Sequence, residues 1–392
     1  MYRILILNLG STSFKFKLYE MGEDESLLCY GSAENIGSGG SFFVKSPQGN
    51  TECGKHACLG HDQAFDLCMT SLDKIGIPIE ISELDAIGYK AVHGGSITGS
   101  QIVNEDLLKE MEKMAPFAPA HNPVYVAMMR SVRAKYPFLT QIACFETSFH
   151  QTVRMERAVY GVPFEWVNEY GIRRYGFHGS SHSYIAWKMS KIAPNAKQVI
   201  SLHLGGSSSL CAINEGESIA TSMGATPQSG VFHNNRVGDF DVFCLPFLSE
   251  RLGGLDKVME ALSNCGGLLG ISGVSNDLRT VQQAATEGNK RAQLAIAAFV
   301  DAITGYIGMY TAFLGGLDAL VFAGGIGFNA ISIRKRIVDK LGFLNAKLDD
   351  SLNKSGCECR ISTPDSHVEI WSLDTNEELM VARGCFELLE TK

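Results

Sequence analysis

A short pattern that occurs twice in the chain constrains its fold more strongly than any other feature. Residues 4 to 13 read as an apolar strand with one polar residue, then Leu-Gly and a hydroxyl-rich turn, and residues 199 to 209 repeat this order. The two Leu-Gly glycines, Gly10 and Gly205, lie about half the chain apart. Repetition of one supersecondary unit indicates an internal duplication. The sequence therefore predicts two similar α/β lobes that face each other.

Both turns have the composition of an anion site. A tight turn rich in Gly, Ser and Thr after a strand offers backbone N–H groups and hydroxyls to a phosphate. Lys15 adds a positive charge after the first turn. A third glycine-rich corner, 324–327, follows another apolar strand. Three such corners predict one nucleotide held from three sides, although neither turn matches the P-loop pattern and no strand is followed by G-x-G-x-x-G.

Hydrophobic periodicity places further elements around these corners. An antiparallel hairpin is expected from residues 4–9 and 14–19, with loops and edge strands over 32–56. The remaining expected elements are helices over 61–75, 107–114 and 124–135, strands over 84–92 and 142–146, and a Pro-bounded loop over 119–123. The apolar segment 294–314 contains Asp301 and two glycines, so it predicts a buried amphipathic helix and not a membrane span.

The composition excludes several classes of partner. With 34 basic and 42 acidic residues the net charge is −8, and no dense Lys/Arg run is present, so we expect neither a nucleic-acid surface nor a membrane patch. The start of the chain reads as a buried strand and not as a signal peptide. The 11 cysteines then predict reduced thiols and a cytoplasmic location.

Candidate groups for chemistry stand at strand ends and in glycine-rich loops. They are His93, His121, Glu146, His178, His182, Arg236, Asp239 and Asp241. The segment 173–182 concentrates two arginines and two histidines beside glycines, which is costly to bury without a ligand.

These residues belong to longer segments that together resemble the acetate kinase family, the short-chain carboxylate kinases related to sugar kinases, heat-shock ATPases and actin. The resemblance runs nearly end to end. The matching segments are residues 8–15, 92–95, 120–123, 145–152, 173–182, 203–205, 221–224, 236–239, 270–277, 324–327 and 375–379.

The resemblance implies an α/β fold of two duplicated ribonuclease H-like (actin-like ATPase) lobes with a central cleft. The N-terminal lobe would comprise 1–148 plus 377–392, with the first phosphate turn and the acyl-acceptor site. The C-terminal lobe would comprise 149–376, with the second phosphate turn and the adenosine site. The implied activity is reversible, Mg²⁺-dependent transfer of a phosphoryl group from ATP to a short-chain carboxylate, directly and in line, by a homodimer.

Site residues follow from the resemblance by position. The expected catalytic residues are His178, Arg236, His121, Lys90 and Glu146. The expected nucleotide-binding residues are Asn8, Ser11, Ser13, Lys15, His203, Gly205, Gly206, Asp277, Arg279, Gly325, Ile326 and Asn329. The expected acyl pocket consists of Val92, Ala120, Phe177 and Pro227, and the expected metal ligands are Asn8 and Glu377.

The chemistry agrees with these roles. Phosphoryl transfer asks a protein to align two oxygens and to stabilise charge on the equatorial oxygens, which Arg, Lys and His donors with Mg²⁺ can do. A carboxylate acceptor is already ionised at pH 7 and needs no general base. His178 is therefore expected to act as an electrostatic donor.

The chain departs from the family pattern close to the expected site. It has Lys90 in place of Arg, Ser96 in place of Glu, Glu146 in place of Asp, Gly206 in place of Asn, and Phe328 in place of Glu. A lysine lacks the bidentate fork of an arginine, and Gly206 lacks a side-chain donor. We therefore expect a divergent kinase with a changed acceptor, donor or rate. Ala120, where Leu is common, predicts tolerance of propionate.

Several alternatives stay open at this point. The losses at positions 90, 96 and 206 also fit a non-catalytic nucleotide sensor or a relative that uses pyrophosphate. A zinc site built from Cys53, His56, Cys58 and His61 is disfavoured, because the spacing fits no zinc knuckle. Cys357 and Cys359 would share one face of a strand, and we assign them no role.

Overall fold

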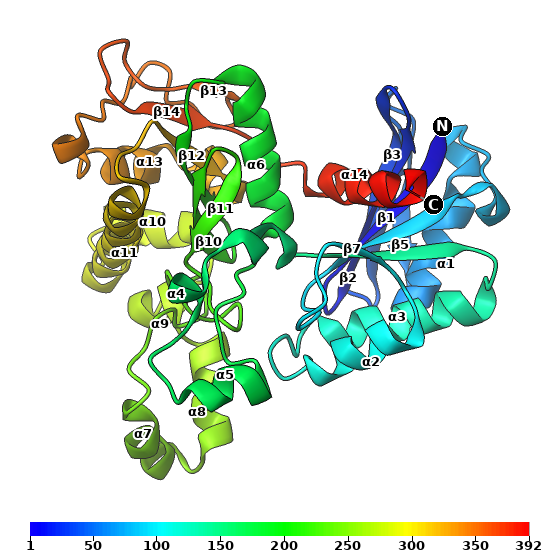
Figure 1. Ribbon diagram of the computed structural model, residues 1–392, viewed down its shortest axis with the longest axis horizontal. Helices are drawn as coiled ribbons and strands as arrows, with labels where there is room; N and C mark the ends of the chain where they lie inside the picture. Colours follow the sequence, from blue (N-terminus) through cyan, green and yellow to red (C-terminus); the bar gives the residue numbers. More distant parts are fainter. Residues whose placement is uncertain (392) are drawn as a thin grey trace. The chain divides into compact units, whose positions relative to one another are not determined.

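The computed structural model describes residues 1–391. The chain divides into two compact units (Figure 1): unit 1 consists of Met1–Ser148 and the segment from Asn376 onward, and unit 2 consists of Phe149–Thr375. The expected lobe boundaries, 148/149 and 376/377, lie within one residue of this division. Their assignment as functional lobes stays a prediction.

Unit 1 is a mixed sheet with helices on both faces. Its strands are β1 (Tyr2–Leu9), β2 (Ser13–Met21), β3 (Glu25–Glu34), β4 (Gly40–Lys45), β5 (Thr51–His56), β6 (Ala86–Ala91), β7 (Ser100–Ile102) and β8 (Thr140–Phe145). Its helices are α1 (His61–Ser71), α2 (Glu105–Lys113), α3 (Asn122–Lys135) and α14 (Glu377–Glu390), with 3₁₀ turns at Asp73–Ile75 and Ile81–Glu83.

Unit 2 is built in the same way. Its strands are β9 (Gln198–Leu204), β10 (Ser208–Asn214), β11 (Glu217–Thr221), β12 (Ala319–Ala323), β13 (Cys359–Arg360) and β14 (Glu369–Ser372). Its helices are α4 (Met155–Ala158), α5 (Phe164–Tyr170), α6 (Gly179–Ile192), α7 (Cys244–Leu252), α8 (Leu255–Asn264), α9 (Gly267–Ser272), α10 (Leu278–Thr286), α11 (Lys290–Leu314), α12 (Gly324–Asn329) and α13 (Ile331–Val338). A 3₁₀ turn at Ser148–Thr152 joins the units, and another lies at Gly342–Leu344.

The internal duplication extends well beyond the two turns. In unit 1 the sheet contains the order β3-β2-β1-β6-β8, and in unit 2 it contains β11-β10-β9-β12-β14. The first three strands of each set pair antiparallel, and the last three pair parallel. Each repeated turn therefore joins the central strand of its sheet, β1 or β9, to the neighbouring antiparallel strand.

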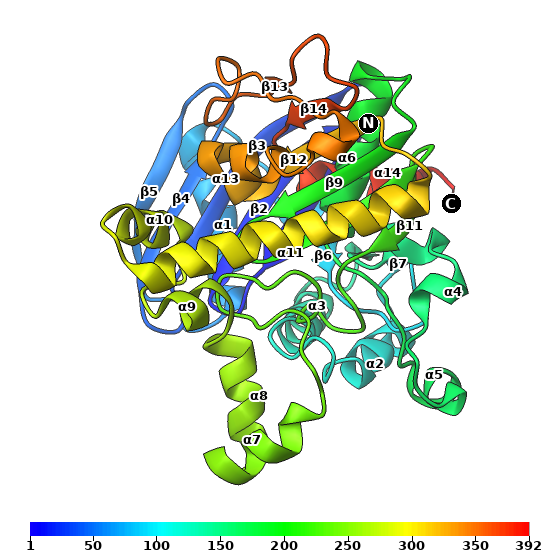
Figure 2. The same cartoon turned by 90° about the vertical axis from the view of Figure 1, so that its left-hand side faces the viewer.

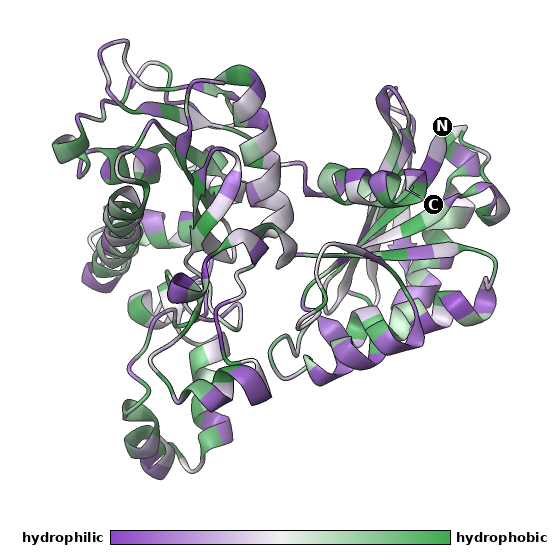
Figure 3. Cartoon of the chain, viewed as in Figure 1, coloured by the Kyte–Doolittle hydropathy of each residue, from purple (hydrophilic) through white to green (hydrophobic). Residues whose placement is uncertain are grey.

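Both faces of each central strand are buried, which explains its nearly continuous apolar sequence. Leu5 and Leu7 of β1 pack under α1 and α3, whereas Ile4 and Ile6 pack against the opposite face, which α14 covers. In unit 2, Ile200 of β9 belongs to the core beneath α11. Figure 3 shows the hydrophobic strands of each unit beside helices striped with polar and apolar residues.

The long apolar helix is a core element of unit 2. Figure 2 shows α11 lying across the sheet. Among the described residues it is the one helix long and apolar enough to cross a membrane. Its Phe299, Ile303 and Ile307 are buried in the core, and its Asp301 pairs with Lys340 at 2.7 Å. These contacts confirm the expected buried amphipathic helix.

One local expectation is corrected by the structure. Helix α3 begins at Asn122, so the end of the expected loop 119–123 is helical, with Pro123 in the first turn. Proline is favourable there because that N–H has no intrahelical partner. The glycine corner 324–327 opens the short helix α12, which turns its backbone N–H groups toward the end of β12.

Candidate active site

The first expected phosphate turn is the hairpin between β1 and β2. Asn8 lies opposite Lys15 in the register, and the Gly10 N–H donates to the Ser13 carbonyl at 2.9 Å. A Cβ on Gly10 would clash with Ser13 Oγ as it is placed here, which favours glycine at this position. Ser11 and Lys15 are exposed. The turn thus brings Asn8, Ser11, Ser13 and Lys15 to one end of the sheet.

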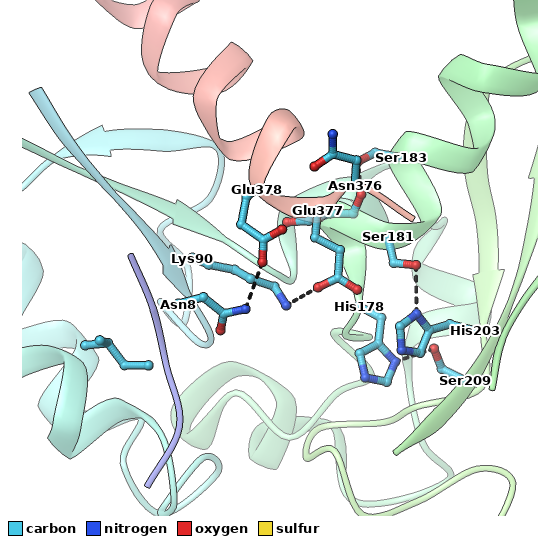
Figure 4. Close-up of polar contacts among 12 residues, drawn as sticks. Asn8, Lys90, His178, Ser181, Ser183, His203, Ser209, Asn376, Glu377 and Glu378 are labelled. Atoms are coloured by element: carbon cyan, nitrogen blue, oxygen red, sulfur yellow. Dashed lines mark hydrogen bonds and ion pairs between the residues drawn. The ribbon is translucent and has the colours of Figure 1, made fainter. Parts of the chain in front are cut away.

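An ionic cluster connects this turn to helix α14 (Figure 4). Lys90 of β6 pairs with Glu377, and Asn8 Nδ2 donates to Glu378 Oε1 at 3.1 Å. Lys17 Nζ lies 3.0 Å from Glu378 Oε2. Both glutamates stand in the first turn of α14, where the helix dipole favours carboxylates. Sequence reasoning missed Lys17 and Glu378, although Glu378 lies within the segment 375–379 that it singled out.

The charges of this cluster are mutually stabilised. Burial alone would lower the pKa of Lys90, but Glu146, Glu377 and Glu378 raise it above its ordinary value. Burial opposes ionisation of Glu378 as well, yet Lys17 and Lys90 lower its pKa to about 2. Glu146 is 4% exposed and acts here as a buried charge beside Lys90. Lys90 therefore remains cationic and Glu378 anionic at neutral pH.

The oxygen atoms of this cluster fit a magnesium ion that a nucleotide helps to hold. The described residues contain no group of three or more His, Cys, Asp or Glu suited to a metal. Mg²⁺ typically keeps several waters and takes one or two carboxylates together with phosphate oxygens. The Asn8 carbonyl and the Glu377 carboxylate supply such a partial set. Glu377 is paired with Lys90 and would exchange that partner for the ion.

A buried amide organises the other loops of unit 1. The Asn122 side chain is fully buried, accepts from the His93 N–H at 3.3 Å, and donates to the carbonyls of His93 and Met111, each at 2.8 Å. It thereby ties the end of β6 to the start of α3, where His121 is the N-cap residue. Val92 packs against the core of this unit, and Ala120 is exposed. Asn122 was not predicted as a site residue, although it adjoins His121.

In unit 2, a layer of histidines and serines lies between α6 and the sheet (Figure 4). Ser209 Oγ lies 2.8 Å from His178 Nδ1. The same oxygen lies 2.8 Å from His182 Nε2. His182 Nδ1 hydrogen-bonds with Ser201 Oγ at 2.9 Å. The rings of His178 and His203 stack at 4.1 Å between centroids. A continuous chain of hydrogen bonds therefore runs from buried Ser201 to His178.

His178 and His182 have different characters. His178 is partly exposed and has a left-handed backbone, with φ 56°, at the N-cap of α6. Burial lowers the pKa of His182 well below its ordinary value, so this ring is neutral. His150 is also buried, with its pKa lowered to about 4, and its Nε2 lies 3.0 Å from the Phe177 carbonyl. His182 and His150 therefore support the segment that presents His178 and Phe177.

The second phosphate turn is fastened to the loop that carries Arg236. Arg236 Nη1 donates to Ser207 Oγ at 3.1 Å and to the Pro227 carbonyl at 3.3 Å. The Ser208 N–H donates to His233 Nδ1 at 2.7 Å. Burial lowers the pKa of Arg236 from its high ordinary value, but a guanidinium stays charged in proteins. The structure thus brings Pro227, Arg236 and the turn together.

A cavity of about 640 Å³ opens beside this turn, a volume typical of a small-molecule site. Residues expected to bind nucleotide line it, namely Gly205, Gly206, Asp277, Arg279, Gly325, Ile326 and Asn329. His203 is not among the lining residues; its Nδ1 hydrogen-bonds with Ser181 Oγ at 2.8 Å. Sequence reasoning missed further lining residues, namely Asn234, Asn276, Leu278, Gln282, Ala330 and Ser355. Asn276 adjoins a predicted residue, whereas the sequence offers no comparable signal for Gln282 or Ser355.

The residues considered for a zinc site, Cys53, His56, Cys58 and His61, do not form a metal-binding group within the described residues. His56 Nε2 hydrogen-bonds with the Glu34 carbonyl at 2.9 Å, and His61 Nε2 hydrogen-bonds with the Gly10 carbonyl at 2.8 Å. Cys357 and Cys359 place their sulfurs 3.0 Å apart, but only Cys359 belongs to a strand.

Two α/β units with the same strand order, one of them holding a nucleotide-sized cavity beside a glycine-rich turn, define a phosphotransferase of the duplicated actin-like ATPase fold. The family model described as the Acetokinase family matches residues 3–383. The chain belongs to this family.

Individual relatives span the full length of the chain. An acetate kinase of Halothermothrix orenii is 39% identical over 99% of this chain and 100% of its own. A propionate kinase of Citrobacter rodentium is 40% identical over 99% of this chain and 97% of its own. The crystal structure of Porphyromonas gingivalis acetate kinase has a TM-score of 0.89 and 33% identity, covering 99% of this chain and 100% of that one. The expected family and duplicated fold are confirmed.

Proposed function

We propose that the protein phosphorylates a short-chain carboxylate with ATP, reversibly, and so forms an acyl phosphate and ADP. One observation carries the proposal: the second glycine turn and the Gly325 corner, expected to bind phosphate and adenosine, line the same 640 Å³ cavity. The relatives named acetate kinase and propionate kinase support the reaction class. They give no support to a non-catalytic sensor or to a pyrophosphate-dependent enzyme.

The nucleotide would lie in the cavity of unit 2. Asp277 caps α10 by accepting from the Arg279 N–H at 2.9 Å, and Arg279 Nη2 pairs with Asp277 Oδ2 at 2.6 Å. This pair forms one wall of the adenosine site. Asn329 Nδ2 donates to the Gly325 carbonyl at 2.9 Å, and both residues line the cavity. The phosphates would extend along Gly205 and Gly206.

The transferring phosphoryl group needs donors that are positioned before it arrives. Arg236 is already held by the Ser207 hydroxyl and the Pro227 carbonyl, and His178 is oriented by Ser209. We assign charge stabilisation to Arg236, His178, His121 and Lys90. Because the acceptor carboxylate is ionised at neutral pH, none of them has to remove a proton from it.

Mg²⁺ would be held by Asn8 and Glu377, with Glu146 as a buried negative charge behind Lys90. When bound, the ion neutralises charge on the phosphates and helps to orient them. Asn8, Ser11, Ser13 and Lys15 would contact the phosphate chain from unit 1. Val92, Ala120, Phe177 and Pro227 are assigned to the acyl group, and small Ala120 favours propionate as an alternative acceptor to acetate.

Hydroxylamine trapping tests the function directly. The purified protein is incubated with ATP, Mg²⁺, hydroxylamine and acetate, propionate or butyrate, and the acyl hydroxamate is measured; pyrophosphate replaces ATP in a parallel series. We expect product with ATP and with acetate or propionate. Absence of product from every pairing would refute the proposed function, and lower use of propionate than of acetate would refute the assignment of Ala120.

We also propose that the protein is a cytoplasmic homodimer. Several large apolar side chains on and beside α7 and α8 are exposed, namely Phe240, Val242, Phe243, Phe247, Leu252, Leu255 and Met259. An apolar surface of this kind is typical of a protein contact. Light scattering after size exclusion should give twice the mass of 42.6 kDa. The double substitution Phe243→Asp and Phe247→Asp should yield monomers, and a monomeric wild type would refute the proposal.

A further inference from the structure

The second phosphate turn lacks a side-chain donor at Gly206, where the family pattern has Asn. Gly206 is exposed and lines the cavity, and its φ lies outside the left-handed region, so its backbone does not require glycine. An asparagine would therefore fit the backbone at position 206, and an amide in this part of the cavity has to come from another residue.

Asn234 occupies the place beside the missing side chain. It lines the same cavity as Gly205 and Gly206. A Cβ built on Gly206 would lie 3.8 Å from Asn234 Nδ2, in ordinary van der Waals contact. The amide of Asn234 thus lies where a side chain from position 206 would extend. The two positions are alternatives for placing one amide in this part of the cavity.

The backbone of Asn234 is held in place without help from its side chain. Its N–H donates to the Gly206 carbonyl at 3.3 Å, and its carbonyl accepts from the Leu269 N–H at 2.9 Å. The preceding residue, His233, accepts from the Ser208 N–H at 2.7 Å. These bonds attach the loop to the turn at His233 and Asn234, and to α9 through Leu269.

The side chain of Asn234 has no such structural task. Its Oδ1 is buried and makes no hydrogen bond with any described residue. Asn234 is half-buried and its amide oxygen has no partner within the described residues, so the side chain is not fixed by a structural hydrogen bond. Its Nδ2 lies beside the turn, 3.8 Å from the position of a Cβ on Gly206. An amide N–H beside a glycine turn is suited to a phosphate oxygen, because hydrogen bonds to charged acceptors are the stronger ones.

We propose that Asn234 supplies the side-chain amide of the second phosphate turn and donates through Nδ2 to a phosphate oxygen of the bound nucleotide. The inference rests on the proposed function. If Asn234 donates in place of an asparagine at position 206, the glycine at 206 does not weaken nucleotide binding. Nucleotide binding should accordingly depend on Asn234 and be indifferent to the neighbouring Asn235, which does not line the cavity.

The test compares Asn234→Ala with Asn235→Ala as the matched control and with the double variant Gly206→Asn/Asn234→Ala. ADP affinity is measured by titration calorimetry, and the KM for ATP by hydroxamate formation. Loss of one hydrogen bond to a charged group should weaken ADP binding and raise the KM for ATP by about 10- to 100-fold in Asn234→Ala. Asn235→Ala should match the wild type. The double variant should regain most of the affinity, because the asparagine introduced at position 206 returns the amide from the other side.

The outcomes separate the inference from the proposed function. If the wild type binds ADP and forms hydroxamate while Asn234→Ala stays within about twofold of it, the assignment of Asn234 is wrong. A double variant no better than Asn234→Ala would also overturn it, since the position of the amide would then not be what matters. A wild type that binds no nucleotide and forms no product would instead refute the proposed function, and with it the inference.

Discussion

Replacing Ser209 by alanine should lower turnover by disorienting His178. The Ser209 hydroxyl is fully buried and lies 2.8 Å from one nitrogen of His178 and 2.8 Å from one nitrogen of His182. Without it, His182 Nε2 is buried without its partner, which costs about 1–3 kcal/mol of unfolding free energy. His178 loses one orienting bond worth about 1 kcal/mol. If that bond serves the transition state, kcat falls by roughly fivefold, the factor to which about 1 kcal/mol corresponds.

Ser201→Ala is the matched control for this prediction. Ser201 is equally buried and bonds the other nitrogen of His182 at 2.9 Å, but it does not contact His178. Both variants should lose similar stability in urea denaturation, while only Ser209→Ala should lose turnover in the hydroxamate assay at saturating ATP and carboxylate. Wild-type turnover in Ser209→Ala, or an equal loss in Ser201→Ala, would refute the assigned role of the hydroxyl.

Three further predictions concern the surroundings of the site. Glu378 has its pKa lowered from 4.5 to about 2, so its contribution to stability is complete above pH 4.5 and is lost as the pH falls toward 2. In urea denaturation the gap between wild type and Glu378→Gln should therefore be about 1 kcal/mol smaller at pH 3.5 than at pH 7, and a constant gap would contradict the shift. Gly88→Ala places a Cβ 2.6 Å from Cys385 Sγ and 2.8 Å from Ile6 Cδ1 and should destabilise the protein by about 1–3 kcal/mol. In an Ile6→Val/Cys385→Ala background, which removes both close atoms, Gly88→Ala should lower the melting temperature less than in the wild type, and an equal decrease would refute the steric explanation. Arg334 is fully buried and donates to the Gly327 and Phe328 carbonyls at 2.8 and 2.7 Å. Because a lysine lacks the guanidinium fork that makes these bonds, Arg334→Lys should raise the KM for ATP severalfold. An unchanged KM would show that the glycine corner 324–327 keeps its structure without the guanidinium group.

Local sequence was sufficient for features that depend on neighbours in the chain. The period-two alternation after Gly10 predicts β2, and the glycines at 205, 206 and 325 mark turns that line the cavity. Such positions are readable because turn chemistry acts within a few residues. The resemblance to a family added Asp277 and Asn329 as residues expected to bind adenosine, and both line the cavity.

Packing against distant segments decided what sequence reasoning missed. Glu378 contacts Asn8 across 370 positions of sequence, and no local pattern pairs it with Lys17. The sequence predicts Asn122 in a loop, whereas in the structure its amide connects the segment after β6 to the start of α3. His182 was a candidate for chemistry by its position, but burial makes it a neutral support.

The sequence by itself determined the duplicated strand–turn unit, the glycine corners and the family, because these are encoded in residues close together or in motifs long enough to be distinctive. Only the tertiary structure decided which charges are neutralised and which amides face the cavity. Burial and charge pairing depend on the whole surroundings of a side chain, and those surroundings come from segments hundreds of residues away. Position 206 is an example. From the sequence alone, Gly206 only lacks a side-chain donor, whereas the fold places the amide of Asn234 beside it.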